Sequence, residues 1–126
     1  MLKLVLQNTS GSLPTSTYTL FDNDKEVGFI QIRHRPSHSQ EVPPDFASHV
    51  YYQIKPEYRD RGYGKKILQL GLAEAKKIGL EEIIITCYDD SIASKKIIEA
   101  NGGVLIDSHI IQTDKKRFLK YLLKIK

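Results

Sequence analysis

A glycine-rich turn between a strand and a helix constrains this chain more than any other feature. The turn, Arg59-Asp60-Arg61-Gly62-Tyr63-Gly64, follows a strand-like run from His49 to Ile54 and opens a helix-like run from Lys65 to Ile78. Backbone N–H groups at such a helix start are unpaired, and with the positive end of the helix dipole they form an anion site. Glycine lets the backbone approach a ligand, and the two arginines suit phosphate oxygens. The segment predicts a site for a phosphate-bearing ligand.

Two common phosphate-binding patterns are absent from this sequence. There is no Gly-x-x-x-x-Gly-Lys-Ser/Thr, so the turn is not a Walker loop, and there is no Gly-x-Gly-x-x-Gly dinucleotide fingerprint. What remains is Arg-x-x-Gly-x-Gly. An ordinary charged turn without a ligand is the alternative interpretation of these six residues.

Length and composition predict one domain, residues 1–126, because 126 residues with 40% hydrophobic and 27% charged side chains suit a single core. Cys87 is the only cysteine, which excludes a disulfide framework and fits a reducing compartment. The N-terminus turns polar after Leu6, too early for a signal peptide or a membrane span. We expect a cytoplasmic protein without a membrane partner.

The formal net charge of +4 allows a nucleic acid, a membrane surface or a small anion as a partner. Much of the excess lies near the C-terminal end, from Lys115-Lys116-Arg117 to Lys126. We interpret these charges as a solvated edge strand that resists aggregation. Aromatic residues are sparsely interleaved with them, so no nucleic acid is expected as a partner.

Hydrophobic periodicity and turn signals predict the order β-β-β-β-α-β-α-β-β. The fold class is α/β, or α+β layered, with a mixed central sheet of about seven strands and two main helices. The expected strands are Leu2–Leu6, Thr15–Phe21, Glu26–Arg33, Ser48–Ile54, Ile83–Cys87, Val104–Ile111 and Phe118–Ile125, and the expected helices are Tyr63–Ile78 and Ser91–Asn101. Asn8–Pro14 and Arg35–Pro44 are expected loops, and the second could act as a lid.

The Arg-x-x-Gly-x-Gly turn resembles the acetyl-CoA pyrophosphate loop of the GNAT N-acetyltransferase superfamily. A second stretch, Cys87 to Gly103, contains Asp89-Asp90-Ser91 and Asn101-Gly102-Gly103 and is similar to the family's second motif. Both motifs stand at the right separation, with the expected elements between them. The resemblance implies a GNAT-like fold and an enzyme that transfers an acetyl group from acetyl-CoA to an amine, without a metal.

The resemblance also implies which residues bind the cofactor. Two neighbouring strands, ending here at Ile54 and Cys87, would separate, and pantetheine would pair with their backbone groups. The implied cofactor-binding residues are Ile54, Arg59, Arg61, Gly62, Tyr63, Gly64, Lys65, Ser91 and Ser94.

Three departures from the family pattern weaken this functional interpretation. Ser91 stands where many relatives have Asn, and Ile98 where many carry a tyrosine that protonates the leaving thiolate. Tyr88, Tyr121 or water could replace that acid. The segment Gln7–Thr15 is too short for the two N-terminal helices that usually wall the acceptor site. A catalytically weak acyl-CoA-binding or regulatory module is therefore the alternative function.

His49 is the candidate general base, because it begins the strand beside the expected thioester and histidine titrates in the right range. A structural strand histidine is the competing interpretation. His34, Glu41 and Asp45 are weaker candidates. Cys87 as an acyl nucleophile is disfavoured, because buried cysteines are usually inert. The acceptor amine and the oligomeric state are left open by the sequence.

Overall fold

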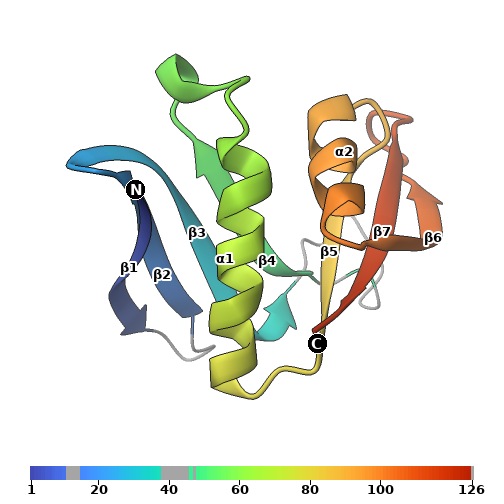
Figure 1. The fold of residues 1–126 in the computed structure, drawn as a ribbon. Coiled ribbons are helices and arrows are strands. Elements are labelled where there is room, and N and C mark those ends of the chain that lie inside the picture. The colour runs from blue at the N-terminus through green and yellow to red at the C-terminus, as the bar shows by residue number, and fades with distance from the viewer. Residues whose placement is uncertain (11–14, 38–45, 47, 126) are drawn as a thin grey trace.

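Strands dominate the described part of the chain, which covers residues 1–10, 15–37, 46 and 48–125 of the computed structural model (Figure 1). The element order agrees with the one that the sequence predicts. The elements are β1 Leu2–Ser10, β2 Thr15–Asp22, β3 Lys25–Ser37, β4 Ser48–Ile54, α1 Tyr63–Ile78, β5 Glu82–Tyr88, α2 Ile92–Ala100, β6 Val104–Ile110 and β7 Arg117–Lys124.

The first four strands form an antiparallel sheet in the order β1-β2-β3-β4. β1 pairs with β2 from Leu2↔Asp22 to Ser10↔Thr15, so it is longer than the expected Leu2–Leu6, and residues 11–14 alone connect the two strands. This confirms that no helix pair stands between them. The polar residues from Asn8 onward predict a loop, but Asn8, Thr9 and Ser10 pair with β2, and this pairing satisfies their backbone groups.

The loop expected from Arg35 to Pro44 begins later than predicted. β3 continues to Ser37, which pairs with Ser48 across a register shift. Residues 38–45, including Glu41 and Asp45, lie outside the described residues, so the expected lid remains a prediction.

The remaining strands form a second antiparallel sheet, in the order β5-β7-β6. The seven strands therefore lie in two hydrogen-bonded sheets. The gap between them falls between β4 and β5, the two strands that the family resemblance implies should separate. β4 and β5 are the edges that face each other (Figure 1). β5 alternates buried and partly buried residues, so its apolar run is fully covered on only one face.

The two helices cover the same side of the strands (Figure 1). α1 has the predicted bounds and packs against β3, where its buried face includes Ile67, Leu68 and Ala75. A Cβ at Gly71 would lie 2.6 Å from Ile30 Cδ1, so this helix approaches the sheet more closely than any side chain would permit. Gly79 ends the helix in the left-handed conformation.

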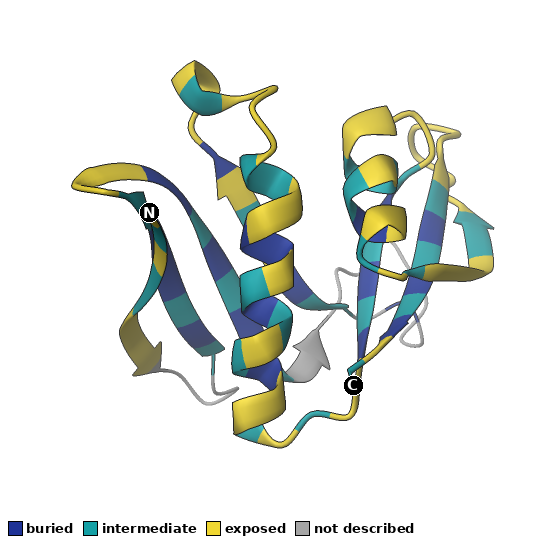
Figure 2. Cartoon of the chain, in the orientation of Figure 1, coloured by how far each residue is buried: buried dark blue, intermediate teal, exposed yellow. Residues whose placement is uncertain are grey.

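One large apolar cluster spans both sheets and the inner faces of the helices. Figure 2 shows the buried residues along the strands and the inner side of α1, and exposed residues on the outer side of both helices. A small second cluster pairs Phe46 with Ile111. Within the described residues, neither helix combines the length and apolar character needed to cross a bilayer.

Candidate functional site

The start of α1 is a helix N-terminus without a side-chain cap, and glycine builds it. Gly62 is the N-cap residue and has φ of +84°, a left-handed value that side chains disfavour. No side chain caps the helix, and its first turn contains no acidic residue. The first turn therefore brings no carboxylate of its own to compete for these backbone N–H groups, which can bind an anion.

The two arginines of the turn have different surroundings. Arg59 Nε donates to the carbonyl oxygen of Ile54 at 3.2 Å, so Arg59 fastens the turn to the end of β4. The Arg61 guanidinium lies 5.7 Å from the centre of the Tyr58 ring, a cation–π contact that holds it over the turn. Arg61, and not Arg59, is among the residues that line the groove described next.

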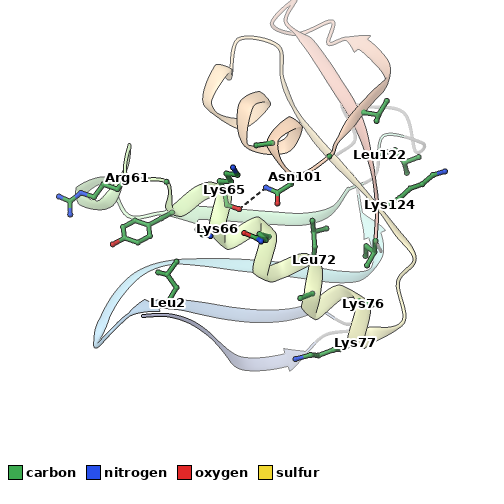
Figure 3. Close-up of a pocket in the computed structure, with 18 of the residues that line it drawn as sticks. Leu2, Arg61, Lys65, Lys66, Leu72, Lys76, Lys77, Asn101, Leu122 and Lys124 are labelled. Atoms are coloured by element: carbon green, nitrogen blue, oxygen red, sulfur yellow. Dashed lines mark hydrogen bonds between the residues drawn. The ribbon is translucent and has the colours of Figure 1, made fainter.

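A groove of about 1570 Å³ opens from this turn along α1 toward the end of β7 (Figure 3). Its lining contains Gly62, Tyr63 and Lys65 of the predicted loop, so the structure brings these residues together. Its charged side chains are all basic: Arg61, Lys65, Lys66, Lys76, Lys77 and Lys124. Such a lining attracts a polyanionic ligand to the helix start.

Glycine at position 64 has a packing role that the sequence did not reveal. A Cβ at this position would lie 2.5 Å from Ile97 Cδ1, so Gly64 permits close packing of α1 on α2. Asn101 secures the same contact, because its Nδ2 donates to the carbonyls of Lys65, at 3.2 Å, and Ile97, at 3.0 Å. The sequence predicts Asn101 at the end of a helix, but no sequence signal shows that its side chain holds α2 against the start of α1. We call the segment Arg59–Lys65 the anion loop.

A second hollow, of about 510 Å³, lies between β4 and β5; we call it the inter-sheet cleft. Its lining residues come from five elements and the segment before β4: Arg33, Phe46, Ser48, Val50, Tyr51, Tyr52, Ile85, Thr86, Cys87, Tyr88, Ser91, Ser94, Ile98 and Phe118. Ser91 and Ser94 of the predicted cofactor set therefore line this cleft, apart from the groove that contains Gly62 and Lys65.

The cleft is closed at one end and open at the other. Near the start of β4, Ile84 N donates to His49 Nδ1 at 3.0 Å, and Ser48 Oγ donates to the Ile84 carbonyl at 3.4 Å. From there the two strands diverge toward Ile54 and Tyr88 (Figure 1). Among the described strands, β4 pairs with β3 alone and β5 with β7 alone, so the diverging edges offer unpaired backbone groups to an extended ligand.

The hydrogen bond from Ile84 defines the state of His49. A backbone N–H can only donate, so Nδ1 must be unprotonated and the proton of the neutral ring is on Nε2. Burial lowers the pKa of His49, which also favours the neutral ring. The ring's one available lone pair, on Nδ1, already accepts the hydrogen bond from Ile84 N. The geometry therefore favours His49 as a link between β4 and β5 over His49 as a general base.

Other candidates from the sequence are held in structural contacts. His34 Nε2 lies 2.9 Å from Ser16 Oγ, in a polar pair between β3 and β2. Burial raises the pKa of the Cys87 thiol to about 11, so it stays protonated near neutral pH and is a poor nucleophile. Tyr121 donates to Glu99 Oε2 at 3.0 Å and lies outside the cleft lining.

Ser91 stands at the N-cap of α2, and its side chain makes no capping hydrogen bond. Its φ and ψ of −83° and 74° differ from the extended values usual for a capping serine. The hydroxyl therefore does not cap the helix, although the Ser91 carbonyl accepts from Lys95 N at 3.0 Å. The Ser91 hydroxyl therefore lies at the rim of the cleft without a capping hydrogen bond.

Tyr52 is the cleft residue that sequence reasoning overlooked. It shares the inward face of β4 with Val50 and Ile54, and its hydroxyl is buried without a hydrogen-bond partner among the described residues. The period-two pattern of Val50, Tyr52 and Ile54 was a signal that could have placed this side chain inside.

Two antiparallel sheets with separated facing edges, and an anion-binding helix start beside them, define an α/β protein suited to an extended, phosphate-bearing ligand. The chain belongs to the acetyltransferase (GNAT) family, whose model matches residues 4–102. No curated protein is similar enough in sequence to be matched.

Solved structures with the same fold include several that contain coenzyme A. The chain is similar to yncA of Salmonella typhimurium, solved with acetyl-CoA (13% identity, TM-score 0.70, covering 89% of this chain and 65% of that one). It is similar to RimL, an alpha-N-protein acetyltransferase in complex with coenzyme A (17%, 0.68, 88% and 62%). A third is the NatC complex bound to Gag peptide and CoA (16%, 0.66, 87% and 71%). The chain spans less than two thirds of the length of yncA and RimL.

Proposed function

We propose that this protein is an acetyl-CoA-dependent N-acetyltransferase that uses direct attack in a ternary complex. The observation that carries the proposal is the inter-sheet cleft with its unpaired strand edges and the open α1 N-terminus nearby. A phosphate-bearing, extended thioester matches both parts. Family membership and the coenzyme A complexes of similar folds support acetyl-CoA as the donor.

The donor would be held at three places. The pyrophosphate would accept from the amides of Gly62 to Lys65, with Arg61 facing the groove and Arg59 holding the turn against Ile54. The two amides of pantetheine would pair with the free edges of β4 and β5. Ser91 and Ser94 would border the thiol arm from α2.

The chemistry follows from the state of the side chains in the cleft. A neutral amine attacks the thioester carbonyl, the C–S bond breaks, and the sulfur leaves with its electron pair and must gain a proton. An acyl-enzyme on Cys87 is disfavoured because that thiol, only 9% exposed, has a pKa raised to about 11. With the Nδ1 of His49 occupied, water is the simplest acceptor for the amine's proton.

The acceptor is proposed to be an exposed amine on a larger molecule, such as a protein terminus or a lysine. Residues 11–14 alone connect β1 and β2, so no helix pair from this segment walls the acceptor side. An open site orients a small amine poorly, whereas a large acceptor brings its own contacts. A second subunit could cover the acceptor site instead.

We also propose a cytoplasmic location, because the free, buried thiol of Cys87 fits a reducing compartment.

A catalytically weak acyl-CoA-binding module is the second candidate. It is favoured by Ile98, which is buried at the position where many family members carry the acid, and by the open acceptor side.

Two measurements separate the candidates. Calorimetry with acetyl-CoA tests binding, and release of the CoA thiol, measured with a panel of peptides bearing free amino termini or lysines and of small amines, tests turnover. Binding with amine-dependent release supports the enzyme, binding without release supports the module, and absence of binding contradicts both.

A further inference from the structure

The Tyr52 hydroxyl is a buried polar group whose partner is missing. Its oxygen makes no hydrogen bond of normal geometry to a described residue, although the Ser94 hydroxyl lies close enough to offset part of the rise in pKa that burial causes. A buried hydroxyl without such a bond loses its hydration and gains nothing in return, so it destabilises the folded state. Such groups are rare in native proteins, and each calls for an explanation, such as a ligand that supplies the partner.

The surroundings of Tyr52 indicate which ligand atom that could be. Tyr52 reaches the cleft from β4, while Ser94 of α2 and Cys87 of β5 lie near enough to influence the titration of its hydroxyl. Ile98 lies one turn after Ser94 and lines the same cleft. Tyr52 therefore presents a hydroxyl to the face of α2 on which family members usually place their tyrosine.

We propose that Tyr52 is the acid that protonates the leaving thiolate, replacing from β4 the hydroxyl that Ile98 lacks on α2. The proposal rests on the proposed acetyltransferase function. As the tetrahedral intermediate collapses, the C–S bond breaks and its electron pair goes to sulfur. The Tyr52 Oη–H bond breaks, and its proton forms the S–H bond of CoA. The tyrosinate then regains a proton from water, which has received one from the attacking amine.

The protonation state of Tyr52 suits this role. Burial is the largest cause that raises its pKa, and the neighbouring Ser94 hydroxyl offsets part of the rise. The hydroxyl is therefore protonated near neutral pH, as an acid must be.

The other tyrosines are less suitable. Tyr121 is committed to Glu99, and the pKa of its hydroxyl is raised to about 12. Tyr51 is 49% exposed. Tyr88 has its ring edge against Phe118, at 5.2 Å between centres, and under the Lys116 ammonium.

The test is Tyr52→Phe, which removes one oxygen and retains the ring, with Tyr121→Phe as the matched control at a buried tyrosine outside the cleft. With the best amine of the panel, Tyr52→Phe should lower kcat about a hundredfold or more, the usual contribution of an acid. The acetyl-CoA KM should stay within about twofold, because the ring still packs, and Tyr121→Phe should retain kcat within a few-fold. An unchanged kcat in Tyr52→Phe, or an equal loss in both variants, would overturn the assignment.

Binding gives a readout that does not depend on turnover. At pH 9, where much of the CoA thiol is ionised, the wild type should bind CoA about two- to tenfold more tightly than desulfo-CoA, the range for one hydrogen bond. Tyr52→Phe should bind the two equally. If the wild type binds CoA and shows no preference, the Tyr52 assignment fails while the proposed function stands. If the wild type binds neither, the proposed function itself fails.

Discussion

The anion loop and the inter-sheet cleft are two halves of one proposed site, yet they are built in opposite ways. The loop is a continuous segment, Arg59 to Lys65, whose chemistry is mainly backbone N–H groups at a helix start. The cleft collects its lining from β3, β4, β5, α2 and β7 and from Phe46. The loop can be recognised from six consecutive residues, whereas the cleft exists only when distant strands come together.

This difference indicates which kinds of substitution should disturb the loop and which should disturb the cleft. Local geometry at Gly62 and packing against α2 maintain the loop, so its weak points are backbone conformation and helix contacts. The cleft depends on the separation of two strand edges, which the bridge from His49 to Ile84 limits at one end. Substitutions in the loop should therefore act on donor affinity, directly or through the packing of α1 on α2, and those in the cleft on stability and rate.

The largest effect is expected at Gly64. Gly64→Val should destabilise the protein by about 1–3 kcal/mol, because its side chain overpacks the contact with Ile97, and acetyl-CoA affinity should fall with it. Denaturant titration and calorimetry measure the two quantities.

A matched pair identifies the cause. Gly64→Ala places its Cβ 2.5 Å from Ile97 Cδ1, and Ile97→Val removes that methyl group. The double variant should recover both stability and affinity. If stability returns and affinity does not, the Cβ at position 64 obstructs the phosphate of the ligand directly, and packing on α2 is not the cause of the lost affinity.

The bridge between β4 and β5 is the next test. His49→Ala should cost about 1–3 kcal/mol, because it leaves the Ile84 N–H without its acceptor. His49→Asn places an amide oxygen near Nδ1 and should recover much of this loss. If alanine and asparagine both retain stability and both lose the acetylation rate, His49 acts as the base that the sequence predicts.

The same residue should make stability depend on pH. The folded-state pKa of His49 is lowered from its ordinary 6.5, so the unfolded chain binds the proton more readily. This contribution is fully present above about pH 6.5 and is lost as the pH falls through the lower, folded-state pKa. Urea titrations between pH 5 and 8 should show that loss in the wild type and a smaller one in His49→Asn.

The two arginines provide a smaller contrast within the loop. Arg61→Ala should weaken acetyl-CoA binding by about 1 kcal/mol, because Arg61 lines the groove and is partly screened by water. Arg59→Ala should instead affect the end of β4, through its hydrogen bond to Ile54. Calorimetry at two salt concentrations checks this, since only the Arg61 effect should shrink with salt. Equal salt dependence would place both guanidinium groups at the phosphates.

The smallest effect is expected at Ser91. A capping serine would cost about 1 kcal/mol when replaced by alanine. Because the Ser91 hydroxyl makes no capping hydrogen bond, Ser91→Ala should change the unfolding free energy by less than about 0.5 kcal/mol. A decrease of the unfolding free energy near 1 kcal/mol would show that the Ser91 hydroxyl does cap α2.

The sequence predicted the element order and the bounds of β4 and α1, because glycine, proline and hydrophobic periodicity are local signals. It was less successful with β1 and β3, which continue to Ser10 and Ser37. Polar residues at these strand ends resemble loops, and only pairing with β2 and β4 shows that they are strands. The division into two sheets followed from family resemblance and not from any residue pattern.

By itself the sequence determined that Arg59–Gly64 forms a glycine turn at a helix start, because Gly62 and the helix that follows act within a few residues of one another. Only the tertiary structure decided what Gly64, His49 and Tyr52 do. Gly64 meets Ile97 of another helix, His49 accepts from a strand 35 residues away, and Tyr52 lacks a partner in a cleft formed by two sheets. Such roles depend on which surfaces are brought into contact, and packing of distant elements, rather than local conformation, determines that.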